Sequence, residues 1–305
     1  MSDAGQKKST FGLLMRMALG MAIGVGIVVG ADPQTKFLRV TDSATPPGAL
    51  RMTLAVLLIA ALYFWGGQIV ARSRRFAVSA PLTATGRPKL RRGHYRGGYR
   101  ALQWQVILCL WLWYAYPDQW TWQSVGLKDE VPIALSALIG VSAYGVLLAV
   151  LTFAVRCAGD EGKFLDGTVR SMAALIPRAK KQKRLTWTAF CVFNPFIEEL
   201  LFRGVLVYQT ALAAGTAWWP IAVGLVVNIG NHWYQGGRSM ALHVPFYAIA
   251  IGLLFSQHGL VGAIAFHAAG DIVPMALVRR HLRQFRERHR EFGDRSEEFV
   301  LTELG

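Results

Sequence analysis

A pair of acids followed by an arginine stands in the middle of an apolar stretch. Residues 185–208 read LTWTAFCVFNPFIEELLFRGVLVY and contain Glu198, Glu199 and Arg203. Glu199 and Arg203 are four residues apart, so on a helix they share one face and can form an ion pair. Glu198 lies about 100° further round the helix axis, where no neighbouring residue of the stretch neutralises its charge. This arrangement leaves one carboxylate of the pair available for chemistry.

Two further stretches carry ionisable groups at the same spacing. His267 and Asp271 are four residues apart within residues 259–278, and Asn228 and His232 are four apart at the end of residues 211–232. A glutamate and a histidine can take a proton from water, and further polar groups can stabilise an oxyanion. Together these groups are suited to the hydrolysis of an amide. The same residue types also bind zinc and relay protons in transporters, so a zinc site and a proton pathway stay open as alternatives.

The elements that must position these groups are long apolar segments. The chain has 305 residues, of which 53% are hydrophobic and 17% are charged, against about 25% charged in soluble domains. A helix needs roughly 20 apolar residues to cross a bilayer. Eight segments qualify as spans, at residues 11–31, 53–71, 101–116, 131–155, 185–208, 211–232, 239–256 and 259–278. The composition excludes a disordered chain, and its three cysteines exclude a disulfide-rich secreted domain.

The basic residues give this bundle an orientation. The formal net charge is +15, and 26 of the 33 Lys and Arg residues lie at the N-terminus, in residues 72–100 and 157–184, at position 238 and after residue 278. These segments fall on one side of eight crossings, and the positive-inside rule places that side, with both termini, in the cytoplasm. The basic runs therefore indicate topology and contact with membrane lipids, and no nucleic-acid partner is expected.

We therefore predict an all-α fold, a polytopic membrane helix bundle of about eight transmembrane helices. Residues 1–10 form a cytoplasmic tail, residues 11–278 form a single membrane domain, and residues 279–305 form a basic cytoplasmic tail. The membrane domain divides into a scaffold half, 11–156, and a polar, catalytic half, 185–278, because nearly all ionisable residues inside the spans belong to the second half. Cleavage of the first span as a signal peptide is the alternative for the N-terminus.

The fifth span is also predicted to contain a helix break. Asn194-Pro195 precedes the acidic pair, and proline removes a backbone hydrogen-bond donor. Pro195 suits the first position of a new helical segment that Asn194 caps, and Glu198 would then lie in its first turn, where the helix dipole favours an anion.

The three motifs, in this order on successive polar helices, resemble those of the CPBP intramembrane proteases, a family that includes CAAX prenyl endopeptidases and bacteriocin-processing or Abi-like members. Glu198-Glu199-x-x-x-Arg203 and His267-x-x-x-Asp271 match the family patterns E-E-x-x-x-R and H-x-x-x-(N/D). The second pattern, F-x-x-x-H, keeps His232 but has Asn228 in place of phenylalanine.

The resemblance implies that Glu198 and His232 activate water and that His267 and Asp271 form the oxyanion site. It implies supporting roles for Glu199, Arg203 and, at the phenylalanine position, Asn228.

The expected function is then that of an intramembrane endopeptidase in the cell (inner) membrane, acting on a membrane-associated or prenylated peptide. No cofactor is required by this scheme, although zinc, and hence a metalloendopeptidase, remains possible. The alternatives are a non-catalytic scaffold or immunity protein of the same family and a proton-coupled transporter. No inverted repeat is visible in the sequence, which disfavours the transporter.

Overall fold

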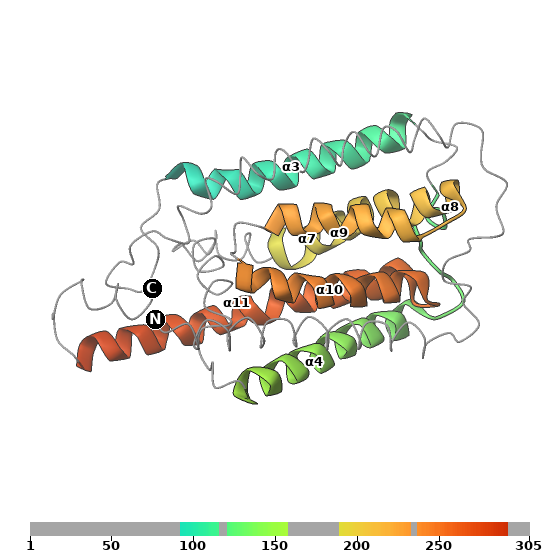
Figure 1. Cartoon of the computed structure of the whole chain (residues 1–305). Helices are drawn as coiled ribbons and strands as arrows, with labels where there is room; N and C mark the ends of the chain where they lie inside the picture. Colours follow the sequence, from blue (N-terminus) through green and yellow to red (C-terminus); the bar gives the residue numbers. More distant parts are fainter. Residues whose placement is uncertain (1–91, 116–120, 158–188, 233–236, 292–305) are drawn as a thin grey trace, which may run out of the picture.

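The computed structural model describes residues 92–115, 121–157, 189–232 and 237–291. Every regular element in these ranges is a helix and none is a strand, which confirms the predicted all-α class for the described part of the chain (Figure 1). The first two predicted spans, at 11–31 and 53–71, and the tail at 1–10 lie outside the described residues.

Two of the described helices are long and apolar enough to cross a membrane. They contain the segments Ile133–Phe153, with 21 residues, and Gly259–Ala276, with 18 residues. At 1.5 Å per residue these segments are about 27–32 Å long, close to the thickness of a bilayer core. This finding agrees with a helical membrane protein, while the total number of spans and the side on which the termini lie stay predictions.

The acidic pair lies on a rod built from four consecutive helical segments. These are η1 (Ala189–Phe193), α7 (Asn194–Glu198), η2 (Glu199–Gln209) and α8 (Thr210–Ala214), of which η1 and η2 are π-helical. The residues at their junctions, Phe193, Glu198 and Gln209, all have right-handed helical dihedral angles. We call residues 189–214 the central helix.

The predicted break at Asn194-Pro195 is therefore wrong. Phe193 is helical and no side chain caps the start of α7, so the chain continues through Pro195 without a new N-terminus. The π-helical turns on both sides explain how this is possible, because local π adjustments re-satisfy the backbone groups that a proline frees in a membrane helix. Glu198 consequently has no helix N-terminus beside it.

The boundary between the fifth and sixth predicted spans also differs from the structure. Residues 211–214 end the central helix, and Gly215 follows with a φ of 65°, a left-handed conformation that glycine adopts at little cost. The next helix, α9, runs over Trp218–His232, so it begins seven residues later than the predicted span. Alanine is a strong helix former, which explains why Ala211, Ala213 and Ala214 extend the preceding helix.

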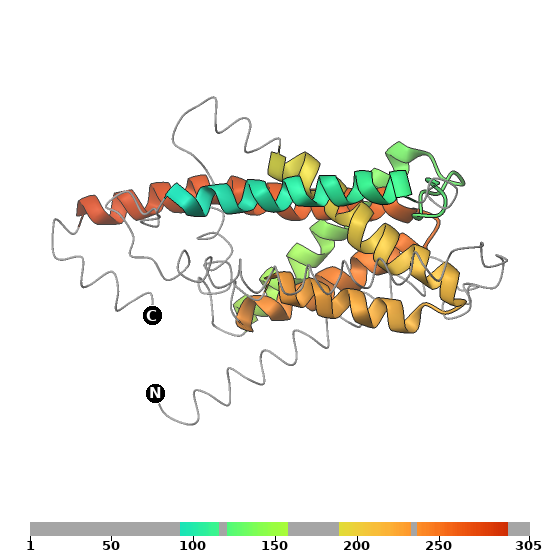
Figure 2. The same ribbon diagram turned by 90° about the horizontal axis from the view of Figure 1, so that it is seen from above.

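The remaining helices complete the described bundle. They are α3 (Arg92–Ala115), α4 (Ile133–Cys157), α10 (Gly237–Phe255) and α11 (Gly259–Glu291). The helix α3 begins earlier than the predicted span, and α11 continues well past residue 278, so residues 279–291 of the predicted tail are helical (Figure 2). Helices α3, α9, α10 and α11 all contact segments of the central helix.

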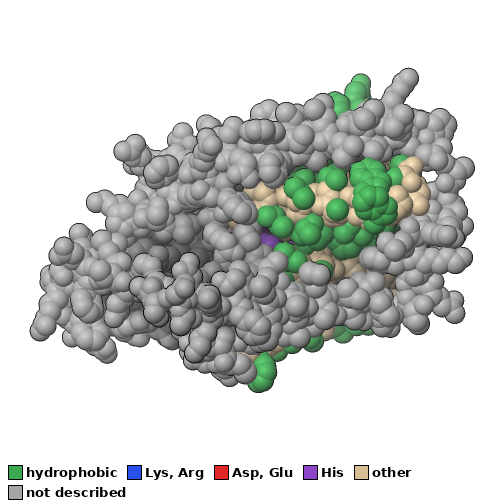
Figure 3. Space-filling model, viewed as in Figure 1, with side chains coloured by type: hydrophobic (Ala, Val, Ile, Leu, Met, Phe, Trp, Pro, Cys, Tyr) green, Lys and Arg blue, Asp and Glu red, His purple; other side chains and the backbone are tan. Residues whose placement is uncertain are grey.

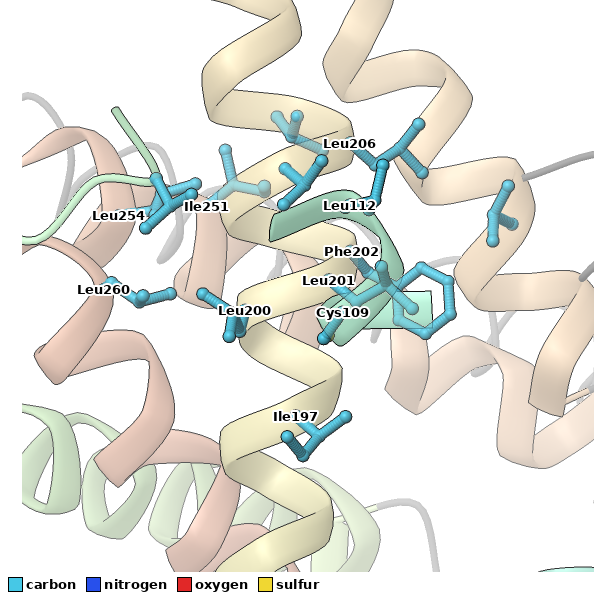
Figure 4. Close-up of a cluster of buried hydrophobic side chains, with 14 of the residues drawn as sticks. Cys109, Leu112, Ile197, Leu200, Leu201, Phe202, Leu206, Ile251, Leu254 and Leu260 are labelled. Atoms are coloured by element: carbon cyan, nitrogen blue, oxygen red, sulfur yellow. The ribbon is translucent and has the colours of Figure 1, made fainter. Parts of the chain in front are cut away.

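Apolar side chains fill the space around the central helix. Leu200, Leu201, Val205 and Leu206 are buried there. The close-up shows Leu200, Leu201 and Leu206 among side chains from α3, α10 and α11 (Figure 4). The cluster is completed by buried residues from the neighbouring elements, which include Cys109, Leu112, Val125, Val227, Tyr247, Ile251, Leu254 and Leu260. This packing fixes the depth and rotation of the helix that carries the acidic pair.

Close backbone contact joins α4 to α11. A side chain on Gly140 of α4 would collide with the carbonyl oxygen of Gly262 on α11, so only glycine allows this approach. Nearby, the rings of Tyr144 and Phe266 meet edge to face at 5.8 Å. The scaffold helix α4 thus holds α11 in the position from which His267 and Asp271 extend.

Large apolar side chains also cover the outside of the described helices. On α9, Trp218 and Val226 are 63% and 57% exposed, and in Figure 3 hydrophobic side chains dominate the described surface in this region. On α4, Ile133, Leu138 and Phe153 are at least 60% exposed. Exposed apolar surface of this extent is typical of helices that face lipid.

Candidate active site

Glu199 and Arg203 form a buried ion pair on the central helix. The guanidinium Nη1 of Arg203 lies 3.1 Å from Oε1 of Glu199, and the two side chains are 2% and 0% exposed. This confirms the predicted pair. Nη2 of Arg203 donates a hydrogen bond of 3.2 Å to Oδ1 of Asn228 on α9, and the guanidinium lies 5.3 Å from the ring centre of Tyr247 on α10. Arg203 therefore contacts three helices: its own central helix through Glu199, α9 through Asn228 and α10 through Tyr247.

His267 extends from α11 into the same cluster. Its Nδ1 lies 2.6 Å from Oε1 of Glu199, the oxygen that also binds Arg203. A carboxylate in an ion pair accepts hydrogen bonds, so Nδ1 of His267 carries the hydrogen and donates it. The other nitrogen, Nε2, lies 3.8 Å from Oε2 of Glu198 and 3.9 Å from Oδ2 of Asp271. One imidazole thus stands among three carboxylates from two helices.

The two glutamates differ in how accessible they are. The side chain of Glu198 is 18% exposed and that of Asp271 is 16% exposed, whereas Glu199 is fully buried. Glu199 is paired with a cation, while the hydrogen bond of Glu198 comes from a neutral amide, Nε2 of Gln105 on α3, at 3.2 Å. Glu198 and Asp271 are therefore the carboxylates of this cluster that a water or a substrate can reach.

His232 lies at the end of α9 beside this cluster. It interacts electrostatically with Glu198, His267 and Arg203. Its Nδ1 lies 2.8 Å from the carbonyl oxygen of Asn228, and since a carbonyl only accepts, Nδ1 donates this hydrogen bond. The neutral ring then has an unprotonated Nε2, the form that can accept a proton. The structure thus brings residues of all three sequence motifs into one site.

Three residues of the site were not predicted from the sequence. Gln105 binds Glu198, and Asn194 makes a side-chain hydrogen bond to Asp271 instead of capping a helix. The ring of His243 on α10 stacks on that of His232 with centres 4.1 Å apart. Asn194 precedes Glu198 by four residues, so the same spacing rule that paired the other residues could have placed it on that face.

Several buried polar atoms of the site have no hydrogen-bond partner among the described residues. They include an acceptor, Oε2 of Glu199, and two donors, Nε of Arg203 and Nδ2 of Asn228. Buried groups of this kind are usually satisfied by internal water. The interior around the acidic pair is therefore chemically suited to hold water, which a hydrolytic reaction consumes.

The described residues do not fit a zinc site. Within the described ranges, no group of three His, Cys, Asp or Glu side chains is arranged to hold a metal ion. The Nδ1 atoms of His267 and His232 both donate to oxygen acceptors of the protein, so neither Nδ1 is available as a metal ligand. The metalloendopeptidase that the sequence left open is thus not supported by the described residues.

Comparison with known proteins gives a family match over part of the chain. The family model described as type II CAAX prenyl endopeptidase Rce1-like matches residues 180–273. No curated protein and no solved structure matches the chain. The matched segment contains all the predicted site residues from Glu198 to Asp271 and leaves out α3 and α4. Residues 180–273 are therefore similar to Rce1-like type II CAAX prenyl endopeptidases, which confirms the resemblance to the CPBP intramembrane proteases over this part of the chain.

Proposed function

We propose that this protein is an intramembrane endopeptidase that hydrolyses a peptide bond near the membrane with a water molecule activated by Glu198. The proposal rests on the observation that the two glutamates differ in burial and in their partners. Glu199 is fully buried and paired with Arg203, whereas Glu198 is partly exposed and hydrogen-bonded by a neutral amide. A carboxylate that water can reach and that the buried arginine does not bind can take a proton from that water.

The first step is attack by water on the scissile carbonyl carbon. Glu198 and His232 orient the water, and Oε2 of Glu198 takes its proton while the oxygen forms a bond to carbon. The carbonyl oxygen becomes an oxyanion. In its doubly protonated form, His267 presents an Nε2–H to this oxyanion, because its Nδ1 is already donating to Glu199. The carboxylate of Asp271 lies 3.9 Å from the same Nε2, where its negative charge stabilises the doubly protonated ring that donates to the oxyanion.

The second step breaks the carbon–nitrogen bond. The proton held by Glu198 passes to the departing amine nitrogen, and the carbonyl re-forms as a carboxylic acid. Glu199 and Arg203 take no part in proton transfer. They hold His267 by its Nδ1 and keep its Nε2 directed toward the reacting atoms. The distances of 2.6 Å and 3.1 Å to Oε1 of Glu199 support this role.

The substrate class follows from the family and from the apolar surroundings. We propose a membrane-associated peptide, with a prenylated C-terminal peptide as the first candidate. In the proposed topology, eight spans place both termini and the site entrance on the cytoplasmic side of the cell (inner) membrane. The basic segments that the positive-inside rule places on this side support this orientation.

The test is a cleavage assay with the full chain purified in detergent. A prenylated peptide ending in C-a-a-X is incubated with wild type, with Glu198→Gln and with Glu130→Gln. The control makes the same chemical change at an exposed carboxylate outside the site. We expect Glu198→Gln to lower the rate at least about 100-fold, the usual contribution of a general base, while Glu130→Gln leaves the rate unchanged. Equal cleavage by wild type and Glu198→Gln would contradict the proposal, and no cleavage by wild type would favour a non-catalytic membrane protein.

A further inference from the structure

A buried glutamine on the scaffold helix α3 reaches the proposed catalytic base. Gln105 is 3% exposed, although α3 exposes large apolar side chains such as Ile107 and Leu110 at 50% and 56%. A polar side chain on a helix of this kind is costly unless it has a partner or a function. Gln105 lies outside residues 180–273, the segment that the protease family model matches. It thus belongs to a part of the chain to which the family match assigns no role.

The contact of Gln105 has a defined direction. Its Nε2 lies 3.2 Å from Oε1 of Glu198. Since a carboxylate oxygen accepts, the amide nitrogen faces Glu198, and a flipped amide would bring two acceptors together. The hydrogen bond occupies Oε1 and leaves the other oxygen, Oε2, as the one that faces Nε2 of His267 at 3.8 Å. Gln105 therefore distinguishes the two oxygens of the base.

The carbonyl oxygen of the Gln105 side chain is evidence against a purely structural role. Oε1 of Gln105 is buried without a hydrogen-bond partner among the described residues. A buried acceptor without a partner destabilises the folded state, so an apolar side chain of the same length would suit folding better at this position. Sites that give up stability in this way are typically retained for function.

The packing of α3 explains how the glutamine is held in place. Cys109 and Leu112 follow it by four and seven residues, on the same face of the helix, and both are buried against the central helix. The helix α3 also contacts α7, the segment that ends at Glu198. Gln105 is therefore presented to the base by a rigid, packed element rather than by a loop.

We propose that Gln105 is a positioning residue for the proposed peptidase reaction. It holds Oε1 of Glu198 so that Oε2 is directed toward the attacking water and His267. The proposal rests on the function proposed above and extends the active site to the scaffold half of the chain. It predicts that the Rce1-like segment, without α3, has an incompletely oriented base.

The test compares variants that separate orientation from folding. Gln105→Met removes the amide and keeps the length of the side chain, so the hydrogen bond is lost without a cavity. We expect kcat on the prenylated peptide to fall at least about tenfold while KM changes less than about twofold, because misorientation of a reacting group affects the chemical step. The melting temperature in detergent should change little, because the lost hydrogen bond to Glu198 is offset by removal of a buried acceptor without a partner.

Two further variants keep the result interpretable. Gln105→Asn retains a buried amide but is one methylene too short to reach Glu198, so its kcat should fall as in Gln105→Met. Val125→Ala, in the same buried cluster but outside α3, is a packing control that should lower the melting temperature and leave kcat unchanged.

Unchanged kcat in both Gln105 variants, with an active wild type, would overturn the positioning role and leave the proposed function intact. A fall in melting temperature with unchanged kcat per folded molecule would overturn it as well, since that is the signature of a packing residue. An inactive wild type would instead refute the proposed function itself.

Discussion

Replacement of Arg203 by methionine removes the cation at the centre of the buried network. Arg203 pairs with Glu199 at 3.1 Å, donates to Asn228 at 3.2 Å and is 2% exposed. After the change, the fully buried Glu199 keeps only the hydrogen bond from His267, and Oδ1 of Asn228 loses its donor. Breaking a buried pair by removing one partner costs about 3–5 kcal/mol, because the remaining charge is left uncompensated. We therefore expect a large loss in the free energy of unfolding.

The cause of that loss can be isolated with a double-mutant cycle. Glu199→Gln should also destabilise the protein, because it leaves Arg203 buried without its counter-ion, whereas the double variant buries neither charge. The losses in the free energy of unfolding of the two single variants, added together, should then exceed the loss of the double variant by at least about 2 kcal/mol. Lys128→Met is the control, since Lys128 bonds a neutral group, the Tyr208 hydroxyl, and its loss should cost only about 1 kcal/mol.

The measured quantity is the free energy of unfolding of each variant relative to wild type. All variants are purified in the same detergent and unfolded under the same conditions. Additivity of Arg203→Met and Glu199→Gln within about 0.5 kcal/mol would refute the buried pair as the source of stability. A single-variant effect no larger than that of Lys128→Met would refute it in the same way.

Two further predictions concern the elements around the site. Gly140→Val should lower the melting temperature and reduce activity, because its side chain would meet the carbonyl of Gly262 and push α11 away, whereas Gly145→Ala on the same helix has open space and should be tolerated. Equal melting temperatures for the two variants would show that the close approach is dispensable. His243→Phe should keep most of the cleavage activity, because a phenyl ring preserves the stacking on His232, whereas His243→Ala should lower the activity. A lower activity in His243→Phe than in His243→Ala would indicate that the imidazole itself takes part.

The spacing of polar residues predicted much of the site. Positions four apart share a helix face, so the pair formed by Glu199 and Arg203 could be read directly from the sequence, and the structure confirms it. The cost of charge in an apolar segment predicted that these residues turn into the bundle, and they are buried there. Both rules apply within a single helix, and the apolar segments of the sequence predict where the helices lie.

Contacts between helices could not be predicted in the same way. Gln105 and Glu198 are 93 residues apart, and no local rule links their positions. The stacking of His243 on His232 depends on how α9 and α10 pack, which single-helix periodicity does not specify. The continuity of the central helix through Pro195 depends on π-helical turns that propensity rules do not anticipate.

The central claim is that Glu198 activates a water molecule that attacks the peptide directly. Single-turnover cleavage of the prenylated peptide in water enriched in oxygen-18 tests it, with mass analysis of both the released peptide and the protein. We predict one heavy oxygen in the new C-terminal carboxylate of the product and none in the side chain of Glu198. Label in the Glu198 carboxylate would show a covalent acyl intermediate on that residue and would contradict the account, as would a cleaved product without label.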